Sequence, residues 1–172
     1  MIRKTCVWAA ALAFSASVHA VDSVSFEYGR GNDETNLWRL GAQWNWNKKW
    51  FADRPWQLGA YWDLQVGHWT AQEGITDLGF TPVFRLQRAY PTGIAYIEGA
   101  VGFHLLSNQR ISTHRFFSTR FQYGDHIGIG TRFGERRRYD VSLRLQHLSN
   151  GGLEHPNPGI NFFQARLQYH FD

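Results

Sequence analysis

Eight segments of the chain alternate between apolar and polar residues. They run over residues 24–28, 38–46, 56–66, 78–86, 95–105, 121–133, 139–149 and 161–171. Because successive side chains of a strand point to opposite faces, this pattern predicts β-strands with one apolar and one polar face. Most of the segments have roughly the ten-residue length that a tilted membrane strand needs. We therefore expect an all-β chain.

Two all-β architectures fit this alternation, and they differ in which face lies inside. In a soluble sandwich the apolar faces pack inward. In an outer-membrane barrel they contact lipid, and the polar interior can hold charges of both signs. The polar faces do carry both signs, at positions that include Arg39, Asp63, Glu98, Arg144 and Arg166.

Aromatic content favours the barrel over the sandwich. Aromatic residues make up 16% of the chain, with eight Trp, which is typical of the girdles at membrane interfaces. We expect one domain over residues 21–172 that forms an eight-stranded antiparallel transmembrane β-barrel. A barrel of this size fills its interior with side chains, so we do not expect a pore.

The first twenty residues predict a secretory signal peptide. A basic start is followed by an apolar run and by Val18-His-Ala20, a small-residue cleavage pattern. Removing residues 1–20 lowers the formal charge from +4 to +2, too mild a balance to indicate a nucleic-acid partner. It also removes Cys6, the only cysteine, so the mature chain has no thiolate for a disulfide or a metal.

Two details of the predicted strands are unusual. Pro82 lies inside the fourth segment, where a closed barrel offers no free edge, so we expect a bulge or a broken ladder bond there. The last segment, from Phe163 to Phe171, looks like the aromatic-ended final strand of outer-membrane proteins, although Asp172 follows it.

A histidine and a serine continue the apolar row of the seventh segment. His147 and Ser149 have the same parity as Val141, Leu143 and Leu145, so they share one face of the strand. At this spacing an imidazole can take the proton of a serine hydroxyl, as a serine nucleophile requires. The alternative is that residues 149–152 form only a turn, because Ser, Asn and Gly are common turn residues.

The position of this pair in the barrel points to a lipid substrate. With both termini in the periplasm, the seventh strand ends near the outer leaflet at Ser149. Its parity directs Ser149 and His147 toward lipid. Polar groups that face lipid are costly, which makes them functional candidates. A hydrolase whose site opens sideways onto the outer leaflet would act on a lipid.

The same region carries a family resemblance. His147-Leu-Ser-Asn-Gly-Gly-Leu-Glu-His-Pro-Asn-Pro-Gly-Ile-Asn161 resembles the active-site segment of the lipid A 3-O-deacylase (PagL) family. These are eight-stranded outer-membrane barrels that remove the ester-linked 3-O-acyl chain of lipid A. The resemblance implies Ser149 as the nucleophile and His147 as the general base. It also implies the residues near the oxyanion, which are Asn150, Gly151, Gly152 and Asn157.

One position departs from the family pattern. The family's glutamate, which orients the histidine, aligns with Asn161. Asn161 shares the outward parity of Phe163 and lies on the strand next to His147. Its carbonyl can accept the histidine N–H and hold the tautomer, but it cannot stabilise the imidazolium as a carboxylate does. Glu154, in the loop, is the alternative orienting residue.

Three arginines lie on an outward loop between the fifth and sixth segments. Arg110, Arg115 and Arg120 fall in a span from Gly99 to Gly124 that contains no Asp or Glu. Arginine suits bidentate binding of phosphate, so contact with lipid A phosphates is one interpretation. Plain solubility of the loop is the other.

Together with the family resemblance, which implies lipid A as the substrate, these patterns predict an outer-membrane esterase that hydrolyses a lipid A ester without a metal or an organic cofactor. We expect a monomer or a weak homodimer. A phospholipase with the same catalytic residues is one alternative. A non-catalytic barrel that serves adhesion or structure is another.

Overall fold

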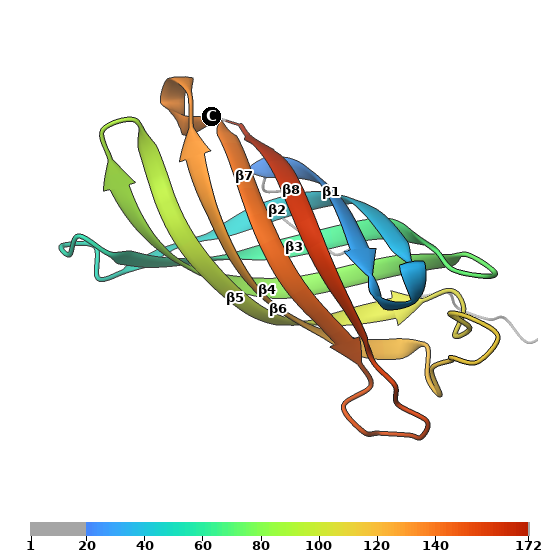
Figure 1. Cartoon of the computed structure of the whole chain (residues 1–172). Coiled ribbons are helices and arrows are strands. Elements are labelled where there is room, and N and C mark those ends of the chain that lie inside the picture. Colours follow the sequence, from blue (N-terminus) through green and yellow to red (C-terminus); the bar gives the residue numbers. More distant parts are fainter. Residues whose placement is uncertain (1–19, 172) are drawn as a thin grey trace, which may run out of the picture.

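A computed structural model describes residues 20–171. The strands are β1 (Ser23–Gly31), β2 (Asn36–Trp50), β3 (Gln57–Thr70), β4 (Ile75–Tyr90), β5 (Gly93–Leu106), β6 (Phe121–Phe133), β7 (Tyr139–Ser149) and β8 (Ile160–His170), with short 3₁₀ turns η1 (Asn32–Glu34) and η2 (Glu135–Arg137). Each strand pairs antiparallel with its neighbours and β1 pairs with β8, which closes the barrel (Figure 1). The predicted eight-stranded antiparallel barrel is confirmed. The predicted signal peptide, apart from Ala20, lies outside the described residues.

The two faces of the strands are distributed as the alternation predicts. Apolar side chains such as Leu40, Val66, Ile97 and Leu145 are exposed on the outside. The connections at the end that carries the termini are short, and the longest loops, residues 107–120 and 150–159, lie at the opposite end (Figure 1). Short periplasmic turns and longer outer loops are the rule for outer-membrane barrels, so we call the loop end the outer end.

No helix within residues 20–171 has the length and apolar character needed to cross a membrane.

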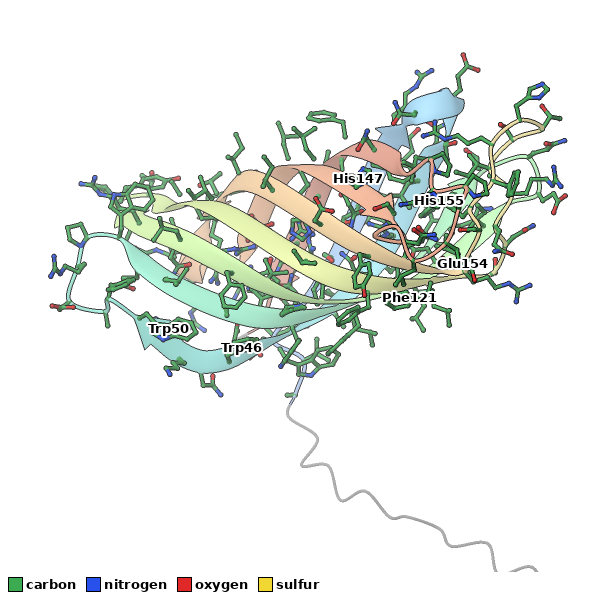
Figure 2. The ribbon with its side chains drawn as sticks, turned by 90° about the horizontal axis from the view of Figure 1, so that it is seen from below. Trp46, Trp50, Phe121, His147, Glu154 and His155 are labelled. Carbon is green, nitrogen blue, oxygen red and sulfur yellow. The ribbon has the colours of Figure 1, made fainter. Side chains whose placement is uncertain are left out.

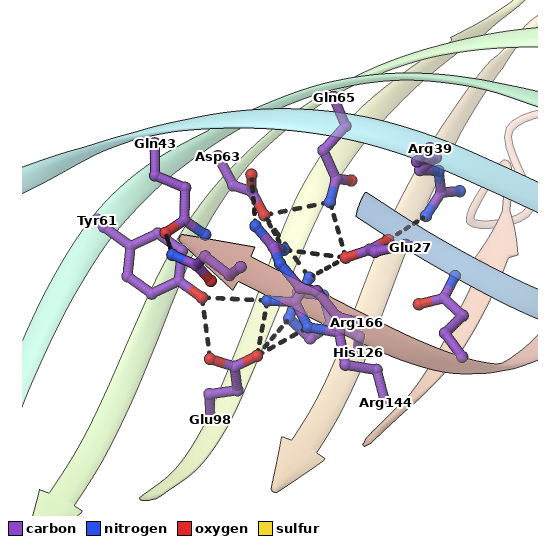
Figure 3. Close-up of polar contacts among 12 residues, drawn as sticks. Glu27, Arg39, Gln43, Tyr61, Asp63, Gln65, Glu98, His126, Arg144 and Arg166 are labelled. Atoms are coloured by element: carbon purple, nitrogen blue, oxygen red, sulfur yellow. Dashed lines mark hydrogen bonds and ion pairs between the residues drawn. The ribbon is translucent and has the colours of Figure 1, made fainter. Parts of the chain in front are cut away.

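A network of buried ion pairs fills the middle of the barrel (Figure 3). Arg144 donates to Glu27 at 2.6 Å and to Glu98 at 2.7 Å. Arg166 donates to Asp63 at 2.6 Å. Charges buried in this way are tolerated only because they are paired and hydrogen-bonded. The paired side chains occupy the interior, so the barrel is packed rather than open.

The interior is apolar at the outer end, which the predicted polar interior did not include. Ile111 and Phe117 of the β5–β6 loop fold back into the barrel mouth. Trp69 packs edge-on against Phe117 and Phe162, with ring centroids 6.5 and 5.0 Å apart. The rest of this buried cluster consists of Leu37, Ile75, Leu106, Leu148 and Ile160. The β5–β6 loop therefore closes the outer mouth and forms a base for the neighbouring loops.

Strand irregularities occur at Pro82 and in β2. The pairing of β4 with β5 skips Thr81 and Pro82, and the register is the same on both sides of the gap. The predicted interruption at Pro82 is confirmed as a broken ladder without a bulge, because proline has no N–H to donate. In β2 the register against β3 shifts between Asn45 and Lys49. This irregularity lies close to the periplasmic end of the strand.

Candidate active site

His147 and Asn161 lie opposite each other on β7 and β8. The His147 Nδ1 and Asn161 Oδ1 atoms are 2.7 Å apart. Because an amide oxygen only accepts hydrogen bonds, the ring donates from Nδ1, and in the neutral ring the lone pair is then on Nε2. The histidine is thus oriented in the tautomer that a general base requires.

Ser149 is the last residue of β7 and is partly buried. Its side chain leaves the strand on the same face as that of His147, two residues earlier. Within the described chain the Ser149 hydroxyl forms no hydrogen bond, and His147 Nε2 has no partner either. Catalytic hydrogen bonds are often long before substrate binds and tighten in the complex. The two unengaged groups are therefore candidates for proton transfer once a substrate is bound.

Asn150 is fully buried and organises the loop that follows Ser149. Its Nδ2 donates to Ser118 Oγ and to the Glu154 carbonyl oxygen, each at 2.8 Å. Its Oδ1 accepts the backbone N–H of Gly152 at 2.8 Å. The side chain therefore ties the β7–β8 loop to itself and to the β5–β6 loop.

The backbone N–H groups of the first three loop residues differ in whether they donate a hydrogen bond within the described chain. The Asn150 N–H donates to Asn157 Oδ1 at 3.0 Å, and the Gly152 N–H is held as described above. The Gly151 N–H has no acceptor among residues 20–171. Gly151 has φ +66° and Gly152 φ +81°, conformations that favour glycine. Of these three donors, Gly151 is the one open to a ligand.

Glu154, the alternative partner of His147, lies in this loop beyond the end of β7 (Figure 2). Its carbonyl oxygen accepts from Asn150, and its side chain is exposed. No hydrogen bond joins its carboxylate to His147 in the part of the chain that the structure describes. Geometry thus brings Asn161, and not Glu154, to the histidine.

Gly159 packs directly against the His147 ring, which the sequence pattern did not indicate. A Cβ at this position would lie 2.6 Å from His147 Cε1 and 3.2 Å from Nε2, and φ is +60°. Arg115 of the β5–β6 loop donates through Nη2 to the carbonyl oxygens of Gly159 and, at 3.2 Å, of Pro158. Arg115 therefore holds in place the segment that lies against the Nε2 edge of the His147 imidazole.

A groove of about 580 Å³ opens beside His147 on the lipid-facing surface, and Asp125 and Asn161 also line it. Asp125 lies on β6 directly opposite His147 and is exposed. A carboxylate on the lipid face is costly and marks a functional candidate. The sequence carries a signal for this residue, because Asp125 has the outward parity of Ile127.

Comparison with known proteins settles the family. The family model described as lipid A 3-O-deacylase (PagL) matches residues 36–170. The chain belongs to the lipid A 3-O-deacylase (PagL) family. The resemblance carried by residues 147–161 is confirmed and extends over most of the chain. As a PagL-family protein, the chain is a lipid A deacylase, an ester hydrolase of the outer membrane.

Individual relatives of this PagL-family chain agree with the assignment. The lipid A deacylase PagL of Pseudomonas aeruginosa is 31% identical over 161 residues, which cover 90% of this chain and 91% of the relative. The enzyme of the same name from Bordetella bronchiseptica is 34% identical and covers 86% and 83%. A crystal structure of the outer membrane enzyme PagL is 29% identical, with a TM-score of 0.79 over 87% of this chain and 99% of the other.

The three loop arginines of this deacylase have different surroundings. Arg110 Nε lies 3.6 Å from Glu73 Oε1, and both side chains are about half exposed. Arg115 is partly buried against the β7–β8 loop. Arg120 is exposed. Arg110 and Arg120 are thus the two that face solvent at the outer end.

No group of three or more His, Cys, Asp or Glu side chains within residues 20–171 is arranged to hold a metal ion.

Proposed function

We propose that this chain hydrolyses the 3-O-linked acyl ester of lipid A with Ser149 as nucleophile and His147 as general base. The observation that carries the proposal is the 2.7 Å contact between His147 Nδ1 and Asn161 Oδ1, beside Ser149 in a lipid-facing row. It supports a histidine that is oriented and that, in its neutral form, can accept a proton at Nε2. An opening on the outer leaflet suits an ester near the headgroup of a lipid.

The reaction follows from these positions. Ser149 Oγ attacks the ester carbonyl carbon while His147 Nε2 takes the hydroxyl proton. The tetrahedral intermediate carries its negative charge on the former carbonyl oxygen. It collapses to an acyl-enzyme as His147 returns the proton to the departing sugar oxygen. Water, activated by the same nitrogen, then releases the fatty acid and restores Ser149.

The loop after Ser149 stabilises the oxyanion. Asn150 and Asn157 hold the loop in shape, and Gly152 is bonded to Asn150, so the Gly151 N–H is the donor that meets the developing charge. A donor that is oriented in advance needs no reorganisation during the reaction. Removing one such donor typically lowers turnover by ~10²–10³.

In this proposal His147 is supported from both neighbouring strands, by one residue on each. Asn161 orients the His147 ring, but its amide carries no charge to balance the imidazolium. Asp125 faces His147 from β6 and supplies a negative charge near the ring. Opposite charges interact more strongly in a membrane groove than in water.

Substrate binding at the headgroup involves the outer loops. We assign Arg110 and Arg120, which are exposed, to the phosphates of lipid A. Arg115 instead positions the β7–β8 loop.

The proposal is tested by Ser149→Ala and His147→Ala. Each should abolish loss of the 3-O-acyl chain, measured by mass spectrometry of lipid A from cells that express the variant. Ser112→Ala, in the β5–β6 loop, is the control and should deacylate normally. If Ser149→Ala kept more than a few per cent of the activity, Ser149 would be only a turn residue and not the nucleophile. Faster release of fatty acid from glycerophospholipid than from lipid A would favour a phospholipase.

A further inference from the structure

A pocket lined by positive charges lies at the periplasmic end of the barrel, opposite the catalytic groove. Its volume is about 420 Å³. The lining cations come from four separate elements, namely β2, the β2–β3 turn, β4 and η2, and are Lys49, Arg54, Arg88 and Arg137. No Asp or Glu lines the pocket, and within residues 20–171 none of the four side chains forms an ion pair.

Such a convergence of like charges is unfavourable unless an anion joins it. The four side chains repel one another, and nothing in the described lining neutralises them. Gln57 and Gln87, paired across β3 and β4, add side-chain amides to the same pocket. Gln57 Nε2 already donates to the Ala52 carbonyl oxygen at 2.8 Å. Guanidinium and ammonium groups around one space match the several acceptor oxygens of a phosphate group.

An apolar groove adjoins the charged pocket. The groove has a volume of about 440 Å³ and is lined by Phe51, Trp56 and Leu86 together with Arg54 and Pro55, which it shares with the pocket. The Phe51 and Trp56 side chains are 61% and 42% exposed. Aromatic side chains at this level are typical of the membrane interface. A charged pocket next to an apolar groove matches a ligand that has a phosphate at one end and a hydrocarbon chain at the other.

We propose that this pocket and groove bind an anionic glycerophospholipid of the periplasmic leaflet. Its phosphate lies among Lys49, Arg54, Arg88 and Arg137, and one acyl chain lies along Phe51 and Trp56. Arg88 has the outward parity of Leu86, so lipid can reach the pocket from the membrane side. The site lies at the opposite end of the barrel from Ser149, and the inference does not depend on the proposed catalytic residues.

The test uses the mature protein in a neutral detergent and native mass spectrometry, with phosphatidylglycerol and phosphatidylcholine as probes. We expect phosphatidylglycerol to be retained in preference. Lys49→Ser should weaken its binding about fivefold, which corresponds to about 1 kcal/mol per cation near the membrane surface. Lys48→Ser is the matched control, because the Lys48 ammonium lies over the Trp50 ring at 5.1 Å and does not line the pocket.

A triple variant, Lys49→Ser with Arg54→Ser and Arg88→Ser, should lose the preference, and heat-modifiable gel mobility reports whether it folds. If it does not fold, the comparison of Lys49→Ser with Lys48→Ser decides. The proposed site would be wrong if phosphatidylglycerol and phosphatidylcholine were retained equally. It would also be wrong if Lys49→Ser and Lys48→Ser weakened phosphatidylglycerol binding equally. Inorganic phosphate should compete poorly. Displacement of phosphatidylglycerol by an equal concentration of phosphate would contradict the lipid assignment, because the groove would then contribute nothing.

Discussion

Three neighbours of different chemistry surround the His147 ring. Asn161 accepts its Nδ1–H, Gly159 lies against the edge that carries Nε2, and Asp125 faces it from the next strand. In the proposed mechanism, orientation, space and charge therefore come from separate residues. In a Ser-His-carboxylate triad, one acidic side chain supplies both orientation and charge.

Asn161→Ala should lower turnover far more than Glu154→Ala, because Asn161, unlike Glu154, is hydrogen-bonded to His147. Loss of a buried carboxylate partner can cost ~10⁴ in turnover, and we expect a smaller loss here because an amide gives orientation without charge. Asn161→Glu should keep or raise activity. The measurement is the rate of 3-O-acyl release from purified lipid A. A larger effect of Glu154→Ala would move the orienting role to the loop.

Asp125→Asn should lower turnover about tenfold, since the neutral amide no longer stabilises the imidazolium that forms in the transition state. Adding Asn161→Glu to this variant should restore much of the loss, because a carboxylate then reaches the ring from β8. The four proteins, wild type, two single variants and the double variant, form a cycle that isolates this coupling. Wild-type turnover in Asp125→Asn would show that the charge has no catalytic role.

Among the structural elements, the β5–β6 loop joins the outer mouth of the barrel to the loop that follows β7. It places Ile111 and Phe117 in the barrel mouth, and it contacts the catalytic loop through Ser118 and Arg115. Catalytic geometry on β7 is thus supported from a loop that precedes it in the sequence.

Arg115→Ala should lower kcat by up to ~10² with little change in KM, because small displacements of a catalytic group are costly and Arg115 holds Gly159 against His147. Arg110→Ala is the comparison. It should raise KM instead, because Arg110 is proposed to contact a phosphate of lipid A. Steady-state rates over a range of lipid A surface concentrations separate the two effects. A change confined to KM in Arg115→Ala would make Arg115 a phosphate ligand, as the sequence first suggests.

The strands could be predicted from the sequence, whereas the loop contacts could not. Alternation is a local property, so residues 139–149 already predict β7 and the shared face of His147 and Ser149. Parity and strand order also bring Asn161 to His147. By contrast, the bonds from Ser118 to Asn150 and from Arg115 to Gly159 join residues 32 and 44 positions apart. No periodic pattern marks such pairs.

At the scale of the whole molecule, the barrel has polar residues in the middle of its interior, an apolar cluster inside its outer mouth, and apolar residues on its outer surface. Glu98 illustrates how the interior is held together, because it accepts from Arg144 at 2.7 Å, from Tyr61 at 2.9 Å and from Arg85 at 3.0 Å. These bonds link strands β3, β4, β5 and β7 across the barrel. Stability therefore depends on matched charges in the interior and on lipid at the exterior.

Glu98→Gln should destabilise the barrel by ~3–5 kcal/mol, because it removes from the buried network one of the carboxylates that balance Arg85 and Arg144. Glu73→Gln, at an exposed pair with Arg110, is the matched control and should change stability by less than ~1 kcal/mol. Urea unfolding of the two variants in lipid vesicles, followed by tryptophan fluorescence, measures both values. Equal unfolding midpoints would show that the interior network does not set stability.

The lateral position of His147 and Ser149 has a kinetic consequence. A site on the side of the barrel receives substrate only by diffusion within the leaflet, so encounters take place in two dimensions. The quantity that governs saturation is then the mole fraction of lipid A among the lipids around the barrel, and not its concentration in the suspension. Inert detergent or phospholipid slows such an enzyme simply by spreading its substrate over more surface.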